Sequence, residues 1–332
     1  MTPEEHLALG TINPELEEIL KNSPPAPPLD PNVDIPTLRA TLLAQKRKLT
    51  EAQSTGEVNY IEEDRQIPVR DGTSIAVRIH KPKVPPKDGS PIFVVYHGGG
   101  FVLGGLDSEV LLCRKFTELG GIAVNVDYRM APEDPFPTPI NDAYDALKWT
   151  AANFQELGGN SKKGFLVGGI SAGANFAAVV SHLYRDDKLS PSLSGAYVSI
   201  PACIGPESVP AKYKDVYLSR EQNKDAPRLG KAMVDFFEKL YNADPNSPLV
   251  APSLFETHKG LPPTYFQICG LDPLRDEGII YEDILKEQGV KTKVDFYPGL
   301  PHGFWSWWIE ADFSKKYQED STRALKWLLE QN

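Results

Sequence analysis

The sequence predicts an α/β fold in which helices flank a mostly parallel central sheet and a helical cap covers one edge. Strand and helix patterns alternate from residue 92 to residue 200, and the same alternation resumes at residue 264. Between them, residues 201–261 show no good strand pattern. Alternation of this kind implies right-handed crossovers and a parallel sheet covered on both faces. Where this alternation is interrupted late in the chain, a cap, meaning a group of helices that covers the site, is commonly inserted.

The composition permits one large domain and argues against two classes of partner. The chain has 332 residues, of which 41% are hydrophobic and 24% charged, so a sizeable core is available. Its formal net charge is -10 at pH 7. This balance argues against electrostatic binding to nucleic acid or to an anionic membrane surface.

Targeting and redox signals favour a cytoplasmic protein. The first ten residues carry Glu4, Glu5 and His6 where a secretory signal needs positive charge followed by an apolar block. No apolar run approaches the ~20 residues that span a bilayer. The cysteines, Cys113, Cys203 and Cys269, are widely spaced, so we expect reduced and buried thiols. The six histidines lack metal-ligand spacing, so we expect neither a metal nor another cofactor.

The N-terminal segment, residues 1–56, differs from the rest of the chain. Helical periodicity covers residues 15–21 and 35–52, and a proline-dense stretch, residues 23–31, separates them. We expect these helices to form part of the cap. Two strands follow at residues 58–69 and 74–80, joined by a turn at Asp71-Gly72.

The core is predicted in two parts, residues 57–200 and 262–332, with the cap insert, residues 201–261, between them. In the first part the predicted strands are residues 92–96, 122–126, 165–168 and 193–200, and the predicted helices are residues 107–119, 140–155 and 172–185. The insert carries one amphipathic helix at residues 227–241. In the second part strands are predicted at residues 264–269 and 293–297 and helices at residues 276–288 and 312–329.

The run Gly169-Ile170-Ser171-Ala172-Gly173 lies between a predicted strand and a predicted helix. Glycines two residues before and after Ser171 allow a tight turn that keeps side chains away from the start of the helix. Such a turn exposes the hydroxyl, and the helix N-terminus adds positive potential where an oxyanion forms. Ser171 is therefore the predicted nucleophile.

A serine nucleophile needs a base, and the base needs an acid that orients it. His302 follows the strand at residues 293–297 through Pro298-Gly299-Leu300-Pro301, and Asp272 follows the strand at residues 264–269. The order Ser, Asp, His fits this architecture. Asp276 is the competing acid, but it lies further from the strand end and suits a helix start. The other histidines considered lack strand-end placement or lie outside the motifs, and we expect ordinary surface or core roles for them: His6, His80, His182 and His258.

The run His97-Gly98-Gly99-Gly100-Phe101 follows an apolar strand and predicts an oxyanion loop. Gly99 and Gly100 can aim amide N–H groups inward because no Cβ obstructs the approach, and the amide of Ala172 supplies a third donor. We expect His97 to orient this loop and not to transfer protons. Aromatic and apolar residues near both motifs are candidates for the substrate pocket: Phe101, Val102, Phe304 and Trp305.

Together these motifs resemble the hormone-sensitive-lipase family of α/β-hydrolases, which includes bacterial and fungal carboxylesterases. The similarity runs from about residue 60 and includes residues 127–133, 270–277 and 301–304 as well as both glycine-containing motifs. The resemblance implies the α/β-hydrolase fold, a Ser171-Asp272-His302 triad and a cap built from the N-terminus and the late insert. Ile170 is a departure, because this family often has Asp before the serine.

The resulting hypothesis is a serine carboxylesterase that hydrolyses short- to medium-chain acyl esters of small molecules through an acyl-enzyme. A tailoring esterase or lactonase of secondary metabolism is the alternative within the same chemistry. A small-molecule receptor and a lyase of the same fold are alternatives of other classes. Receptors in this family have lost the histidine, so His302 argues against that class. Whether two copies pair as a homodimer is left open.

Overall fold

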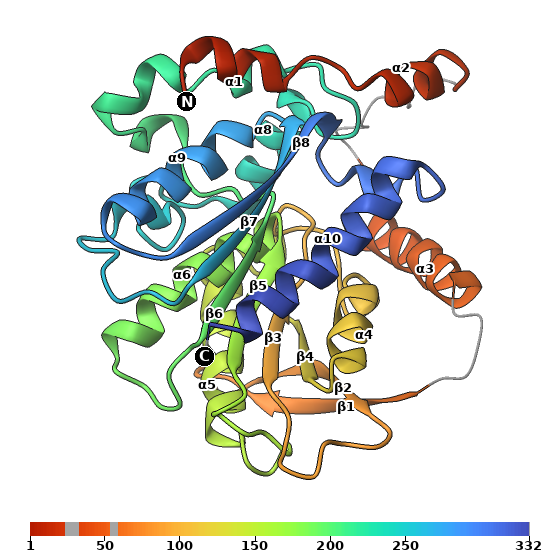
Figure 1. Cartoon of the computed structure of the whole chain (residues 1–332), viewed down its shortest axis with the longest axis vertical. Helices are drawn as coiled ribbons and strands as arrows, with labels where there is room; N and C mark the ends of the chain where they lie inside the picture. Colours follow the sequence, from red (N-terminus) through yellow and green to blue (C-terminus); the bar gives the residue numbers. More distant parts are fainter. Residues whose placement is uncertain (24–32, 54–58, 332) are drawn as a thin grey trace.

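The computed structural model describes residues 1–23, 33–53 and 59–331, and its centre is a single eight-stranded sheet (Figure 1). The strand order is β1-β2-β4-β3-β5-β6-β7-β8. The strands are β1 (Tyr60–Pro68), β2 (Ser74–Pro82), β3 (Ile92–Tyr96), β4 (Ile122–Asp127), β5 (Phe165–Ile170), β6 (Gly195–Ser199), β7 (Thr264–Leu271) and β8 (Thr292–Pro301). All neighbours from β4 to β8 are parallel, and β2 runs antiparallel to both β1 and β4. The predicted fold class is confirmed.

Side-chain alternation along the strands produces two cores, one on each face of the sheet. In β3, Ile92, Val94 and Tyr96 pack into one core, while Phe93 and Val95 pack into the other. The period of two follows from the pleat, and both faces are apolar because helices cover both. The first core includes residues of α5 (Thr138–Ala152), α6 (Ala172–Asp186) and α9 (Arg275–Glu287). The second includes residues of α4 (Val110–Glu118) and α10 (Asp312–Leu329).

Helices outside these layers gather at the edge where the parallel strands end (Figure 1). They are α1 (Pro3–Leu9), α2 (Pro14–Lys21), α3 (Ile35–Gln53), α7 (Ser219–Gln222) and α8 (Lys231–Tyr241). Short 3-10 turns are η1 (Pro206–Ser208), η2 (Ala211–Val216), η3 (Pro252–Leu254) and η4 (Phe304–Ser306). The proline-dense stretch after Ser23 and the predicted strand start at Val58 lie outside the described residues. In the part of the chain that is described, no helix has both the length and the apolar character to cross a membrane.

Three local differences from the sequence-based expectation have physical causes. Helix α1 was not predicted, although Thr2 and Glu5 form a capping box at its start. Helix α8 begins at Lys231 and not at residue 227, because Arg228 has a φ of 74° and Gly230 is the N-cap. Strand β8 continues to Pro301, because Pro301 pairs with Leu271 across a local irregularity. His302 therefore follows the end of a strand directly.

The N-terminal helices are attached to the core by specific polar contacts. Arg39 of α3 forms an ion pair with Glu133 at 3.0 Å and donates to the Val102 carbonyl oxygen at 3.0 Å. The amide of Asn13, the N-cap of α2, donates to the Gly299 carbonyl oxygen at 3.1 Å. These contacts join the cap to the loops that follow β3 and β4 and to the end of β8.

Candidate active site

Ser171 occupies a sharp turn between β5 and α6. Its φ of 56° and ψ of -117° are unfavourable for a residue with a Cβ, and such strain is characteristic of an exposed nucleophile turn. A Cβ on Gly169 would lie 2.4 Å from the Gly173 backbone, and one on Gly173 would lie 2.0 Å from the Tyr96 carbonyl oxygen. Neither contact is possible for a real side chain, so both glycines are required by the close approach of α6 to β3.

The structure brings His302 and Asp272 to this serine. His302 Nε2 lies 2.8 Å from Ser171 Oγ, and His302 Nδ1 lies 2.7 Å from Asp272 Oδ2. The other carboxylate oxygen of Asp272 accepts from the Leu274 amide at 2.8 Å, and Asp272 is almost completely buried. A carboxylate only accepts, so Nδ1 donates to Asp272 and Nε2 is left to accept from the serine hydroxyl.

Asp276 does not take part in this arrangement. Its carboxylate is buried and lies 2.8 Å from His6 Nδ1 and 2.7 Å from Arg275 Nε. It also accepts from the amides of Leu218 and Ser219 in the cap. These four partners give Asp276 a structural position that links α1 and α7 to α9.

The loop after β3 lies beside Ser171, and its two central glycines have positive φ angles. Gly99 has a φ of 129° and Gly100 a φ of 61°. The Gly99 carbonyl oxygen accepts from the Leu103 amide at 2.8 Å, which closes the loop on itself. Gly99 and Gly100 have the backbone freedom that the predicted oxyanion hole requires, and Ala172 directly follows Ser171 at the start of α6.

His97 fixes the start of this loop from within the core. Its ring stacks on Tyr128 at 4.1 Å between centroids, and Nδ1 contacts the Gly98 carbonyl oxygen at 3.0 Å. Complete burial lowers the pKa of His97 to about 3. A neutral, enclosed imidazole is suited to positioning and not to moving protons at neutral pH.

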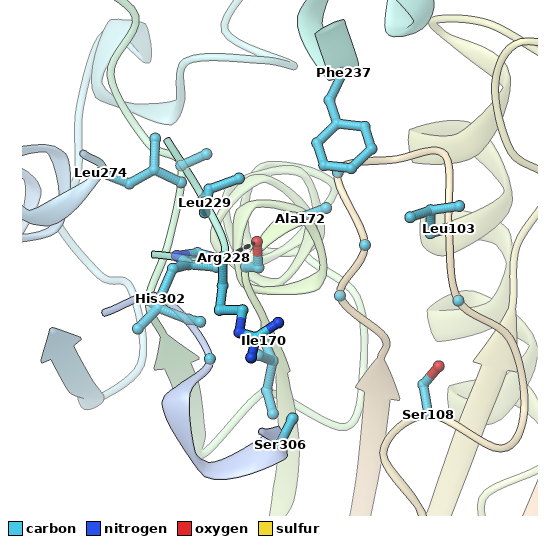
Figure 2. Close-up of a pocket in the computed structure, with 18 of the residues that line it drawn as sticks. Leu103, Ser108, Ile170, Ala172, Arg228, Leu229, Phe237, Leu274, His302 and Ser306 are labelled. Carbon is cyan, nitrogen blue, oxygen red and sulfur yellow. Dashed lines mark hydrogen bonds between the residues drawn. The ribbon is translucent and has the colours of Figure 1, made fainter. Parts of the chain in front are cut away.

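A cavity of about 1850 Å³ opens in front of Ser171 and His302 (Figure 2). Its lining includes residues of the loop after β3, of α3 and of the segment 201–261, and among the apolar lining residues are Leu42, Leu229, Val234, Phe237 and Leu274. Of the predicted pocket residues, Phe101 and Trp305 line this cavity.

Val102 and Phe304 do not line the cavity, and the structure corrects that prediction. The side chain of Val102 is completely buried in the core beneath the oxyanion loop. Phe304 is enclosed by the rings of Tyr297, Trp305, Phe313 and Tyr317. Both side chains pack into the core, whereas their neighbours Phe101 and Trp305 reach the cavity.

Comparison with known proteins identifies the family. The model of the alpha/beta hydrolase fold family matches residues 93–306. An AB hydrolase superfamily protein of Schizosaccharomyces pombe is 40% identical over 320 residues, which cover 96% of this chain and 94% of that protein. The chain belongs to the α/β-hydrolase family. This result confirms the family resemblance that the motifs indicate.

An esterase and a cyclase are also similar to this α/β-hydrolase. The versiconal hemiacetal acetate esterase of Dothistroma septosporum is 38% identical over 244 residues, covering 73% of this chain and 74% of that protein. The crystal structure of vibralactone cyclase superposes with a TM-score of 0.89 at 36% identity, covering 97% of this chain and 96% of that one.

Several residues that line the hydrolase cavity were missed by sequence reasoning. Phe237 and Tyr241 come from α8. The amphipathic pattern predicts this helix but does not indicate which of its side chains face the cavity. Arg228 and Leu229 come from the preceding loop, and Asn175 lies one turn after Ser171. The signal that could have pointed to Asn175 is its position one helical turn after Ser171, the N-cap of α6.

The histidines and cysteines for which no catalytic role is predicted lie in the core. His182 stacks on Phe255 at 4.1 Å and lies 3.2 Å from Nδ1 of His258. Burial lowers the pKa of His182 to about 2 and that of His258 to about 4. His80 is buried beside Glu62. The three cysteines are buried free thiols, and burial raises their pKa values.

Proposed function

We propose that this carboxylic ester hydrolase is a serine carboxylesterase that forms an acyl-enzyme on Ser171. The observation that supports this proposal is the pair of hydrogen bonds through His302, at 2.8 Å to Ser171 and 2.7 Å to Asp272. Such a pair converts a weak nucleophile into one whose proton has a prepared acceptor. The three groups come from the ends of β5, β7 and β8.

In the acylation step, Ser171 Oγ attacks the ester carbonyl carbon while its proton passes to His302 Nε2. The carbonyl π electrons move onto oxygen, and the amides of Gly99, Gly100 and Ala172 donate to that oxyanion. Asp272 stabilises the imidazolium through its bond to Nδ1. The tetrahedral intermediate then collapses, and His302 returns the proton to the leaving alcohol.

In the deacylation step, a water molecule takes the place of the alcohol. His302 accepts a proton from this water as its oxygen attacks the acyl carbon. The same three amides bind the second oxyanion. Collapse releases the carboxylic acid, and the proton returns from His302 to Ser171.

The acyl preference that we propose is for short to medium chains. On the α8 side of the proposed oxyanion loop, Phe237 packs against Gly100, and Tyr241 stacks on Phe101 at 4.0 Å between ring centroids. These contacts restrict the space beside the loop. The cavity also extends away from this loop past Arg228 and Leu229, and we assign that part to the alcohol component.

A second candidate is ring closure, in which a hydroxyl of the substrate replaces water in the second step. It uses the same acyl-enzyme, releases a lactone and regenerates the Ser171 hydroxyl. The observation that favours it is the similarity to vibralactone cyclase over 97% of this chain. Analysis of the products from a hydroxy-acyl ester distinguishes a lactone from a hydroxy acid.

The decisive experiment is a burst measurement with p-nitrophenyl acetate. The wild-type protein should release one equivalent of p-nitrophenol rapidly and gain the mass of one acetyl group at Ser171. Ser171→Ala should abolish both and lower kcat by a factor of about 10⁴ or more. Ser192→Ala, at an exposed serine far from the motifs, is the matched control. Normal turnover by Ser171→Ala would exclude the acyl-enzyme.

A further inference from the structure

Arg228 places a positive charge in the substrate cavity that no acidic side chain of residues 1–23, 33–53 or 59–331 neutralises. It belongs to the loop between α7 and α8, is accessible to solvent and lines the cavity together with Ser171 and His302. In Figure 2 its side chain extends across the site beside His302 and Ile170. Among the described residues no carboxylate forms an ion pair with it.

The guanidinium is held in position by aromatic rings and by its backbone. It lies 4.2 Å from the ring centroid of Trp307 and 5.3 Å from that of Trp308, which are suitable distances for cation–π contact. The φ of 74° at Arg228 is unusual for a residue with a Cβ and persists only where the surroundings impose it. The next residue, Leu229, is buried.

Arg220 differs from Arg228 in having acidic partners. Arg220, which also lines the cavity, is within 2.8 Å of Glu277 and 2.9 Å of Glu238. Its charge is therefore already balanced by carboxylates. The residue before the nucleophile, where an acid would add negative charge, is the apolar Ile170. Arg228 thus retains its charge and its hydrogen-bond donors for a ligand.

We propose that Arg228 binds a carboxylate group of the substrate, so that this hydrolase prefers esters that carry a free carboxylate. This inference rests on the proposed function, because it concerns the substrate of the same site. A planar guanidinium pairs with a carboxylate through two parallel N–H donors, which fixes the ligand as well as attracting it. Against an overall charge of -10, local recognition of this kind is what would admit an anionic substrate.

The test uses two pairs of esters in which only the charge differs. 3-Carboxyphenyl butyrate and its methyl ester carry the group on the alcohol side, and monophenyl adipate and its methyl ester carry it on the acyl side. For at least one pair, kcat/KM of the wild type should favour the acid by about tenfold or more, as expected for a charged hydrogen-bonded pair. The pair that responds identifies the side of the substrate that faces Arg228.

Variants connect this preference to the residue. Arg228→Gln and Arg228→Met, which keeps the apolar stem over the tryptophans, should both reduce the acid-to-ester ratio about tenfold. Lys239→Gln removes an exposed charge from α8 outside the cavity and should keep the ratio. Comparing ratios between variants cancels the different leaving-group strengths of the two phenols.

The outcomes separate this inference from the proposed function. If the wild type hydrolyses no member of either pair, the esterase proposal itself fails. If it hydrolyses both members of each pair equally well, or if both Arg228 variants keep the wild-type preference, the carboxylate proposal is overturned. Should neither variant fold, the salt dependence of the wild-type acid-to-ester ratio of kcat/KM is the test. A preference for the acid that weakens as salt is added supports the proposal, and a ratio that does not change with salt opposes it.

Discussion

Phe237 of α8 lies against Gly100 of the loop after β3 so closely that a Cβ on Gly100 would be 2.4 Å from the Phe237 ring. Two segments that are more than a hundred residues apart in the chain therefore depend on each other. Helix α8 lines the cavity next to this contact, and the loop after β3 can approach α8 because residue 100 has no side chain. The positive φ of Gly100, 61°, adds a second reason for glycine.

Gly100→Ala should lower kcat for p-nitrophenyl butyrate about 100-fold, because the new methyl group displaces a proposed oxyanion donor. The double variant Gly100→Ala/Phe237→Ala should recover part of this loss, since it removes the clash but not the strained φ. Gly72→Ala is the matched control. Gly72 also has a positive φ, 85°, but a Cβ there would meet nothing within 4 Å. Equal activity losses in both single variants would contradict the steric explanation.

Asp272 and Asp276 follow the same strand, and their variants should fail in different ways. Asp272→Asn should reduce kcat by about 10³-fold or more, because an amide opposite His302 Nδ1 favours the wrong tautomer. Its melting temperature should change little.

Asp276→Asn should instead lower the free energy of unfolding by about 3 kcal/mol or more, because Arg275 is buried and loses its charged partner. The folded protein should keep its kcat. Turnover measured below the melting temperature of each variant checks both statements. An activity loss confined to Asp276→Asn would reverse the assignment of the acid.

The proposed catalytic residues could be predicted because strand ends in a parallel sheet meet at one edge. Ser171, Asp272 and His302 each follow an apolar run, and this placement does not depend on how the cap folds. Arg228 and Phe237 could not be predicted, because their direction depends on the packing of an irregular insert. The same limit explains Val102 and Phe304, which were expected in the pocket but point into the core.

Acid should destabilise the protein from about pH 6.5 downward. Burial lowers the pKa of His97 to about 3, that of His182 to about 2 and that of His258 to about 4. At these three positions the unfolded state therefore binds more protons than the native state below pH 6.5. Their contribution to the free energy of unfolding is fully present above that pH and is lost as the pH falls. Each such histidine costs about 1.4 kcal/mol per pH unit in this range.

Denaturant titrations at pH 7.5, 6.5 and 5.5 measure this slope. His182→Gln should make the slope shallower by roughly one proton, although it is less stable than the wild type at pH 7.5. An unchanged slope in His182→Gln would show that this histidine binds its proton equally well in the native and unfolded states, which would contradict its lowered pKa.

Two buried tyrosines that differ in hydrogen bonding should respond oppositely to loss of the hydroxyl. The Tyr241 hydroxyl is buried and has no hydrogen-bond partner in the part of the chain that the structure describes, whereas the Tyr128 hydroxyl donates to the His97 carbonyl oxygen at 2.8 Å. Tyr241→Phe should therefore leave the free energy of unfolding unchanged or raise it, since an unpaired polar group is removed. Tyr128→Phe should lower it by about 1 kcal/mol or more, because it leaves a buried carbonyl without that donor. Paired denaturant titrations of the two variants measure the difference, and a larger loss in Tyr241→Phe would mean that its hydroxyl is hydrogen-bonded in solution.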